Sequence, residues 1–511
     1  MRTVPLAVAA LATVCLATSP APAPPGTETA QDPAGLDQYE VALPIDSEVD
    51  SMALTPDGLV VLGGVTGSDA FPVTPGAVQA QCDHSQYGYC RSPVVMVFSP
   101  GGELLYSTFA GGASQRSLHS AAAAPDGGIW VLLGATYRSP DPVFGGCSPH
   151  QPVLARIRPG RPGYDRYVCV GGTNAYGLHA AGVALAGDGS IWVVGQAAPD
   201  SALHTVNAWQ PAAGGSADVF AIRYGAGGQE TILATYIGGR DLEYPSAAAV
   251  APDGDLVIAG RTQSFDFPAV RALQTRLGGA RPYIADAFIT RLDAGGRWLE
   301  YSTWLGGTEG DGARGVSVDA SGNAYVVGDT SSPDVPVTAG TAGARLWPGP
   351  WSGFLASVDP TGRLRVSTRV AEWPRCVTAR GDGSVSVVGA TYRADFPRAG
   401  RAPRLWPSKP FAEYPFFLQT DALASALSRS TLVPVATGLD PKVHTPTPML
   451  GIGNRIEAAA FDADYLYLAG QTMLWYRPYP ESDSIMIPTG HYLRKWYIGD
   501  PAGRGRGRER R

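Results

Sequence analysis

Charged side chains are scarce in this chain of 511 residues, because Asp, Glu, Lys and Arg together make up only 16% of it. Lysine is almost missing: Lys409, Lys442 and Lys495 stand among 39 basic residues, and the others are arginines. The net charge of -6 is spread along the chain, which argues against a nucleic-acid partner, since such a partner needs a clustered basic face. Hydrophobic residues reach 44%, so a disordered chain is excluded as well.

Long apolar runs are also lacking. After the N-terminal segment no run approaches the roughly 18 apolar residues of a membrane-spanning helix, so an integral membrane protein is not expected. Residues 1–23 combine Arg2, an apolar run and small residues, which is typical of a signal peptide, and a Pro/Ala-rich linker follows at 24–37. We therefore expect a secreted, periplasmic or cell-surface protein. Lipid anchoring at Cys15 is the less favoured alternative, because Val14 is a poor residue before a lipidated cysteine.

Cysteines are few, and five of the six follow the expected signal peptide. In an oxidising compartment we expect the bridges Cys82–Cys90 and Cys147–Cys169, with Cys376 left as a free, buried thiol. The alternative is a zinc site formed by Cys82, His84 and Cys90, but their spacing matches no familiar zinc knuckle. We expect no metal and no cofactor.

Catalytic signatures are missing too. The sequence has no Gly-x-Ser-x-Gly elbow, no HExxH, no phosphate-binding glycine loop before a helix and no sialidase-type Asp box. "DADYLYL" and "TPDG" lack the alternating oxygen ligands of a calcium loop. These absences favour a non-catalytic protein, although propeller enzymes share no common motif and an enzyme therefore stays open.

Turn-forming residues are abundant, with 64 glycines and 44 prolines, about a fifth of the chain. Seven segments share an Asp-Gly-like turn, a run of β-forming residues and a closing glycine. The closing glycines are Gly64, Gly134, Gly195, Gly260, Gly328, Gly389 and Gly470. Such a turn between alternating runs predicts a β-hairpin, and a second pair of strands follows most hairpins. The sequence therefore predicts an all-β fold, a seven-bladed β-propeller of four-stranded antiparallel blades over residues 38–500.

The two ends of this region predict how the ring is closed. The seventh repeat offers only residues 491–500 as its third strand, whereas residues 38–46 form an unpartnered strand before the first hairpin. We expect the N-terminal strand to complete blade seven, because closure removes the open sheet edges that invite aggregation. The Arg/Gly-rich tail, 501–511, is expected to be disordered. The protein is expected to be a monomer.

One repeat resembles a known family. The segment "LEYSTWLGGTEGDGARGVSVDASGNAYVVGDTSSPDVPVT" at 299–338 is similar to the repeat of the SBBP family of bacterial seven-bladed propellers. Matching pieces recur at 234–239, 264–274, 71–79 and 394–397, while blades two, three and seven are degenerate. The resemblance implies a propeller fold and an exported location, and the family is largely without assigned activity.

Recurring aromatic residues are interpreted as packing. Phe71, Phe267 and Phe396 occupy the same place in Asp-Phe-Pro-like loops, and Trp130 and Trp192 occupy equivalent strand positions. An aromatic residue at a fixed place in each blade usually fills the space between adjacent blades, so we favour packing over ligand binding.

A polar ring at the mouth of the central channel is the candidate site. Counting back seven residues from each hairpin turn gives Asp50, His119, Ala181, Ser246, Arg314, Arg375 and Ile456, and His179 lies two residues from its expected place. We select Asp50, His119, His179, Arg314 and Arg375 as candidate ligand-binding residues, suited to an anion, a glycan or a metal ion. The alternative is a solvated rim without function.

Two functions follow from these observations. The first is an exported non-catalytic binding or scaffold module for a protein or polysaccharide of the cell envelope. The second is a hydrolase or lyase whose site lies at the channel mouth.

Overall fold

The computed structural model describes most of the chain between residues 39 and 497. The described residues are 14–15, 39–43 and 48–497, apart from gaps at 83, 85–87, 89, 112–114, 136–142, 149, 173–174, 280–283, 348–350, 381–382, 394–395, 398, 400–413, 433–448, 462–464 and 477–484. The expected linker (24–37) and tail (501–511) lie outside them, as does the expected signal peptide apart from Val14 and Cys15.

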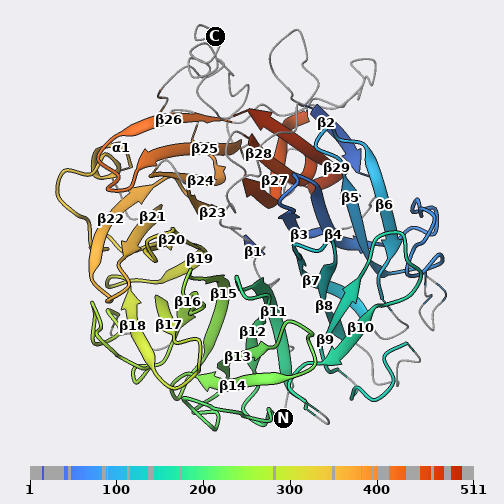
Figure 1. The fold of residues 1–511 in the computed structure, drawn as a ribbon. Coiled ribbons are helices and arrows are strands. Elements are labelled where there is room, and N and C mark those ends of the chain that lie inside the picture. The colour runs from blue at the N-terminus through green and yellow to red at the C-terminus, as the bar shows by residue number, and fades with distance from the viewer. Residues whose placement is uncertain are drawn as a thin grey trace, which may run out of the picture.

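The described strands form an all-β fold of antiparallel sheets of the propeller type. Figure 1 shows seven sheets, numbered here in chain order, arranged around a common centre. Their inner strands are β3 (Glu48–Leu54), β7 (Gln115–Ala123), β11 (Leu178–Leu185), β15 (Glu243–Val250), β19 (Asp311–Val318), β23 (Pro374–Ala379) and β27 (Met449–Phe461). The second strands are β4 (Val60–Thr66), β8 (Ile129–Ala135), β12 (Ile191–Ala197), β16 (Leu256–Thr262), β20 (Ala324–Thr330), β24 (Ser384–Thr391) and β28 (Tyr465–Tyr476).

The outer half of each sheet is built in the same way. The third strands are β5 (Ser92–Phe98), β9 (Val153–Ile157), β13 (Asp218–Tyr224), β17 (Asp286–Leu292), β21 (Ser352–Val358), β25 (Tyr414–Asp421) and β29 (Ile485–Tyr497). The fourth strands are β6 (Leu104–Phe109), β10 (Arg166–Cys169), β14 (Thr231–Ile237), β18 (Leu299–Leu305), β22 (Leu364–Val370), β26 (Leu427–Leu432) and, for the seventh sheet, β2 (Tyr39–Leu43). The short helix α1 (Gly343–Leu346) and the short strand β1 (Val14–Cys15), which runs parallel to β3, complete the described elements.

The strand that precedes the first hairpin pairs with the end of the chain, as predicted. β2 runs antiparallel to β29, with Tyr39 opposite Lys495 and Leu43 opposite His491. The seventh sheet therefore combines one N-terminal strand with three C-terminal strands.

The hairpins between inner and second strands depend on a left-handed glycine. Gly254, for example, has a φ of 92°, and its N–H donates to Ala251 O at 2.9 Å. Only glycine adopts such an angle without a steric penalty, which is why an Asp-Gly-like turn marks the hairpin in the sequence.

In four repeats the closing glycine (Gly195, Gly260, Gly328 or Gly389) is required by an aromatic neighbour on the third strand. At Gly260 a Cβ atom would lie 2.8 Å from Phe288 Cε1 and 2.2 Å from Tyr244 O. The backbone of the second strand thus leaves room for the ring of the third strand, and any larger residue would displace it.

The hydrophobic core lies between neighbouring sheets. Seven clusters of buried apolar residues are present among the described residues, and each draws on two adjacent sheets, including the seventh and the first. Trp130 and Trp192 are 2% and 0% exposed and lie in such clusters. Phe71, Phe267 and Phe396 are buried, with Phe267 4.8 Å from Phe288 between ring centroids. The packing interpretation of these aromatic residues is confirmed.

Candidate functional site

Every inner strand carries a β-bulge at the same place. The register shift at this place leaves one extra residue in each strand: Asp50, His119, Ala181, Ser246, Arg314, Arg375 and Glu457. β7 and β27 each have a second shift nearer the start of the strand. Six of these positions are those given by counting back from the hairpin turn. In the seventh sheet the count is wrong by one residue, since Ile456 pairs with Gly470 and Glu457 is the extra residue. A bulge re-aims a side chain and is frequent beside functional sites.

The bulge ring, defined by these seven residues, lies on the strands nearest the centre in Figure 1. Asp50, His119, Ser246, Arg314 and Arg375 are partly buried, whereas Ala181 is buried. Neighbouring inner strands are tied together just beyond the bulge: Ala121 N donates to Ser51 Oγ at 2.9 Å. The backbone of the ring is therefore regular while its side chains differ in charge.

Arg314 is held by an acidic partner on the adjacent strand. Its Nε donates to Asp329 Oδ1 at 2.5 Å and its Nη2 donates to Oδ2 at 3.2 Å. Burial opposes the charge of Arg314, but the bonds to Asp329 outweigh it and raise the pKa of the guanidinium. The two bonds to Asp329 fix the guanidinium plane and leave Nη1 and the second hydrogen of Nη2 as donors for another group.

The two predicted histidines lie near each other. Burial first, and the nearby His179 second, lower the pKa of His119 to about 4. Partial desolvation, followed by the proximity of His150, lowers the pKa of His179. His119 Nε2 lies 3.4 Å from Ser117 Oγ. Since a lowered pKa leaves an imidazole neutral at pH 7, these two side chains offer lone pairs and N–H groups instead of positive charge.

The five predicted residues do not form one compact cluster. Asp50, His119 and His179 lie on the inner strands of the first three sheets, and Arg314 and Arg375 lie on those of the fifth and sixth. The inner strands β19 and β23 pack against each other, so the two arginines are neighbours in the ring. The ring thus carries His119 on one side and the two arginines on the other. His179 lies outside the ring, two residues before Ala181, and is exposed.

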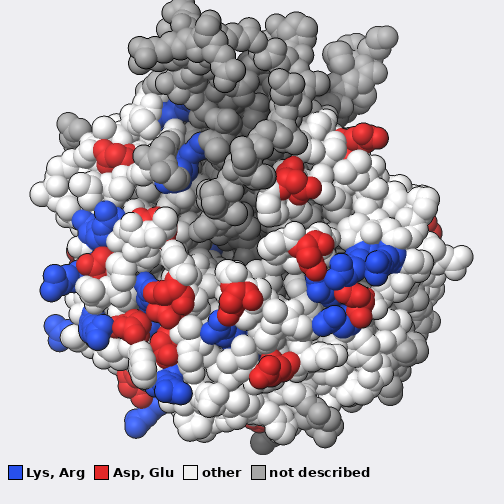
Figure 2. Space-filling model, in the orientation of Figure 1, with Lys and Arg blue, Asp and Glu red and all other residues white. Residues whose placement is uncertain are grey.

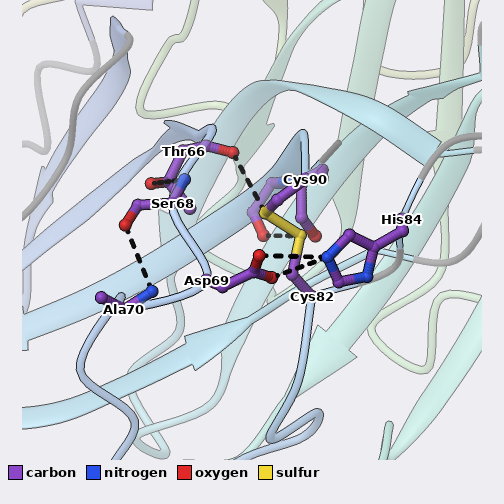
Figure 3. Close-up of a disulfide and its surroundings, with 9 residues drawn as sticks. Thr66, Ser68, Asp69, Ala70, Cys82, His84 and Cys90 are labelled. Carbon is purple, nitrogen blue, oxygen red and sulfur yellow. Dashed lines mark hydrogen bonds and ion pairs between the residues drawn. A yellow bond between two sulfur atoms is a disulfide. The ribbon is translucent and has the colours of Figure 1, made fainter. Parts of the chain in front are cut away.

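The predicted bridges Cys82–Cys90 and Cys147–Cys169 are both present. The zinc alternative is wrong, because the sulfur atoms of Cys82 and Cys90 are bonded to each other. In Figure 3, His84 points to Asp69 beside this disulfide, with Nε2 3.0 Å from the carboxylate. The prediction that Cys376 is free is also wrong: it is disulfide-bonded and 1% exposed. Its partner lies outside the residues whose side chains are described.

Sequence reasoning missed four buried carboxyl groups, those of Asp218, Glu243, Asp286 and Asp311. Each is the first residue of a third or an inner strand. The signal that marks the second and the fourth of them is a Gly-Gly pair ahead of an acidic residue, as in "GGRDLE" and "GGTEGD".

Charge on the surface is mixed. Figure 2 shows acidic and basic side chains interspersed over the described part of the visible face. Among the described residues no helix is long and apolar enough to cross a membrane. The two disulfides fit an oxidising compartment.

Comparison with known proteins identifies one repeat. Residues 300–333 match the SBBP beta-propeller repeat, which confirms the resemblance drawn from the sequence. No curated protein matches the chain.

Solved structures that resemble this chain do so distantly. A quinohemoprotein alcohol dehydrogenase from Comamonas testosteroni is 10% identical, with 91% of this chain and 76% of that chain covered and a TM-score of 0.39. A protein of unknown function from Dyadobacter fermentans is 11% identical, with 75% and 95% covered and a TM-score of 0.37. A putative gluconolactonase is 14% identical, with 70% and 89% covered and a TM-score of 0.31. Similarity at this level identifies no function.

Proposed function

We propose that the chain is an exported, monomeric β-propeller with seven blades, closed by β2 and spanning residues 38–500. The seven described sheets, the apolar clusters between them and the pairing of β2 with β29 support this proposal. In the same proposal residues 1–23 are a cleaved signal peptide, 24–37 a linker and 501–511 a disordered tail.

The proposed function is non-catalytic binding of an anionic ligand, as a binding or scaffold module for a protein or polysaccharide of the cell envelope. The bulge ring carries this proposal. Its backbone is repeated in every inner strand, whereas its side chains change from Asp to His, Ala, Ser, Arg and Glu. A constant frame with varied polar side chains is what a binding surface needs, while a purely structural position would repeat one residue type.

The arginine side of the ring is the expected contact for the ligand. Arg314 and Arg375 carry charge at neutral pH. Asp329 occupies Nε and one hydrogen of Nη2 of Arg314, so Nη1 of Arg314 and the guanidinium of Arg375 would donate to a carboxylate or sulfate group of the ligand. Asp50, His119 and His179 would then contribute neutral or acidic contacts around the ligand, for example to the hydroxyl groups of a glycan.

A binding screen on the purified mature protein tests this proposal. The panel contains uronic-acid and sulfated polysaccharides with neutral glycans as the comparison, and divalent metal ions are screened separately. The double variant Arg314→Ala/Arg375→Ala should bind the best anionic ligand about 100-fold more weakly, because charged hydrogen bonds contribute about 1.5–3 kcal/mol each.

Arg271→Ala is the matched control, because Arg271 is exposed and forms an ion pair with Glu300 at 3.2 Å away from the ring. This variant should bind as the wild type does. If the double variant folds and also binds unchanged, the working surface lies elsewhere than on the ring.

A hydrolase or lyase at the channel mouth is the second candidate, and the contact between Ser117 and His119 favours it. A neutral histidine beside a hydroxyl group has the protonation state of a general base. Ser117→Ala and His119→Ala should then abolish turnover of an ester and glycoside panel. Turnover that is absent in the wild type, or equal in the variants, removes this candidate.

A further inference from the structure

Two of the boundaries between sheets contain a pair of buried carboxyl groups. Asp218 begins β13 in the third sheet, and Glu243 begins β15 in the fourth. Asp286 and Asp311 stand in the same relation between the fourth and fifth sheets. All four residues are buried, and Asp311 is the most exposed at 5%. Each pair therefore connects the third strand of one sheet to the inner strand of the next.

In the first pair, backbone and hydroxyl donors occupy three of the four carboxyl oxygens. Gly214 N donates to Asp218 Oδ2 at 2.5 Å. Gly239 N donates to Glu243 Oε2 at 3.1 Å, and Thr262 Oγ1 donates to Oε1 at 2.6 Å. None of the described groups donates to Asp218 Oδ1.

The oxygen without a donor faces the other carboxyl group. A Cβ atom on Gly238 would lie 2.5 Å from Asp218 Oδ1 and 2.6 Å from Glu243 Oε2, so both oxygens border the space above that glycine. The two side chains come within hydrogen-bonding reach of each other. Two ionised carboxylates have no hydrogen to share, whereas one added proton would complete the bond.

The second pair repeats this arrangement. Gly278 N donates to Asp286 Oδ2 at 2.7 Å, and Asp286 Oδ1 has no hydrogen-bond donor among the described residues. Gly307 N and Ser332 Oγ donate to Asp311 Oδ2 at 2.7 and 2.8 Å. Asp311 Oδ1 also has no donor among the described residues, whereas Glu243 Oε1 accepts from Thr262 Oγ1. The two boundaries thus share the burial, the glycine donors and a third-strand aspartate oxygen without a donor.

The glycine between the two carboxyl groups is also repeated. A Cβ atom on Gly306 would lie 2.7 Å from both Asp286 Cγ and Asp311 Oδ2. Gln274 holds this glycine in place, since Gly306 N donates to its Oε1 at 2.8 Å, as Gly238 N donates to Gln210 Oε1 at 3.1 Å.

Among the described residues, no cation neutralises the negative charge of Asp218 and Glu243. Arg240, Asp241 and Asp266 are the charged groups on the loops beside this first pair. All three are exposed, and Arg240 Nε lies 3.2 Å from the Asp266 carboxylate. Neither Asp218 nor Glu243 forms an ion pair with a described residue.

Near the second pair, Asp334 adds negative charge and Arg369 adds positive charge. Arg369 directs its Nη atoms to Ser352 Oγ and to the Ser332 and Pro333 carbonyl oxygens. Its charge therefore acts on Asp311 only from a distance.

We propose that each of these two pairs shares one proton, and that the two protonated pairs act as a pH-sensitive lock between the third, fourth and fifth sheets. Loss of the protons places two like charges side by side in a buried site and weakens the boundary.

The raised pKa values of the four carboxyl groups determine the pH range in which the lock stabilises the fold. Burial, the largest cause, and the neighbouring negative charge raise the pKa of Glu243 and of Asp286 to about 7 each. Burial likewise raises the pKa of Asp218 and Asp311. A folded-state pKa above the unfolded value near 4 means that stability is fully present below about pH 4 and is lost as pH rises to about 7. We expect the melting temperature to fall by about 5 °C or more between pH 5 and 8.

The double variant Asp218→Asn/Asp286→Asn tests the lock. In each variant side chain the amide NH2 group takes the place of Oδ1 and donates to the partner carboxylate, while the amide oxygen keeps the glycine bond. The variant should lose most of the fall in melting temperature between pH 5 and 8. Infrared spectroscopy at pH 6 should show a protonated-carboxyl band in the wild type that is lost in the variant.

Asp200→Asn/Asp266→Asn is the matched control, because it removes two exposed negative charges that do not raise the pKa of either pair, and it should leave the slope unchanged. A pH slope that persists in Asp218→Asn/Asp286→Asn overturns the proposal. So does a wild type without a protonated-carboxyl band at pH 6, a result that does not depend on the folding of any variant. Stabilisation of the wild type by Ca²⁺ at pH 8 that is lost in the variant would overturn it in favour of a cation site.

Discussion

The boundary between the fourth and fifth sheets and the boundary between the fifth and sixth sheets solve one packing problem with different chemistry. At the first, Asp286 begins the third strand, Trp304 is the sixth residue of the fourth strand, and Gly306 follows that strand. At the second, the same three positions hold Ser352, Arg369 and Ala371. An acid, an aromatic residue and a glycine have been replaced by a hydroxyl group, a cation and a methyl group.

An acidic residue at or just before the start of the inner strand is common to both boundaries. Asp311 and Glu372 each stand three residues before the bulge residue of their strand. Glu372 accepts a hydrogen bond from Thr391 Oγ1 and lies 4.0 Å from Arg393 Nε. A boundary with two carboxyl groups requires a glycine after the fourth strand, because a Cβ atom there would contact both groups. A boundary with one carboxyl group tolerates alanine at that position and has an arginine in the fourth strand.

Removing Arg369, the cation at the boundary between the fifth and sixth sheets, should lower the stability of the protein more than the other single substitutions at these two boundaries. Arg369→Ala leaves Ser352 Oγ and the carbonyl oxygens of Ser332 and Pro333 without their buried donor. We expect the free energy of unfolding in urea to fall by about 3 kcal/mol, since buried bonds to charged groups are expensive to leave unmade. Arg363→Ala, an exposed arginine at the start of the same segment, should change it by less than about 0.5 kcal/mol. Equal effects of the two variants would contradict a structural role for Arg369.

Exchanging glycine and alanine between the boundaries should have an intermediate effect. Gly306→Ala places a Cβ atom 2.7 Å from Asp286 Cγ and Asp311 Oδ2, and these short side chains have little room to move. We expect a loss of about 2 kcal/mol by overpacking, measured by thermal unfolding. Ala371→Gly creates no clash and should remove only about 0.5–1 kcal/mol through backbone entropy. If Gly306→Ala were no more harmful than Ala371→Gly, the two boundaries would not differ in the way described.

The strand pattern could be predicted from the sequence because its causes are local. An Asp-Gly-like turn with a left-handed glycine, as at Gly254, and alternating apolar residues on both sides lie within about a dozen residues of each other. The bulge positions followed from the constant length of these hairpins. The one error, Ile456 in place of Glu457, arose in the seventh repeat, which diverges most from the others.

Contacts between distant segments could not be predicted in the same way. The disulfide at Cys376 and the approach of Asp218 to Glu243 depend on which sheets adjoin and which side chains face each other there. The repeated Gly-Gly-to-acid spacing was visible, but a turn explains it equally well until the buried partner on the preceding sheet is known. The ligand of the bulge ring stays a prediction for a related reason. The bulged backbone is repeated in every inner strand, but the side chains that would bind the ligand differ from strand to strand.

The smallest effect, and the sharpest test of the comparison, is expected from Ser352→Asp. This variant restores at the sixth-sheet boundary the acid found at the position of Asp286, but beside Arg369 Nη1, which lies 2.8 Å from the present hydroxyl oxygen. The guanidinium should hold the pKa of the new carboxyl group below its ordinary value near 4. The added stability, about 1 kcal/mol, should then be present above pH 4 and be lost as pH falls from about 5 to 2.

This pH dependence has the opposite sign to that of the two carboxyl pairs, whose contribution is lost as pH rises. The measurement is the difference in the free energy of unfolding between Ser352→Asp and the wild type at pH 3, 5 and 8, with Ser352→Asn as the uncharged control of equal size. If Ser352→Asp instead loses stability between pH 5 and 8, burial outweighs Arg369 and the two boundaries are electrostatically alike. If the variant is more stable than Ser352→Asn above pH 4, the presence of an arginine determines whether a boundary loses stability as pH falls or as pH rises.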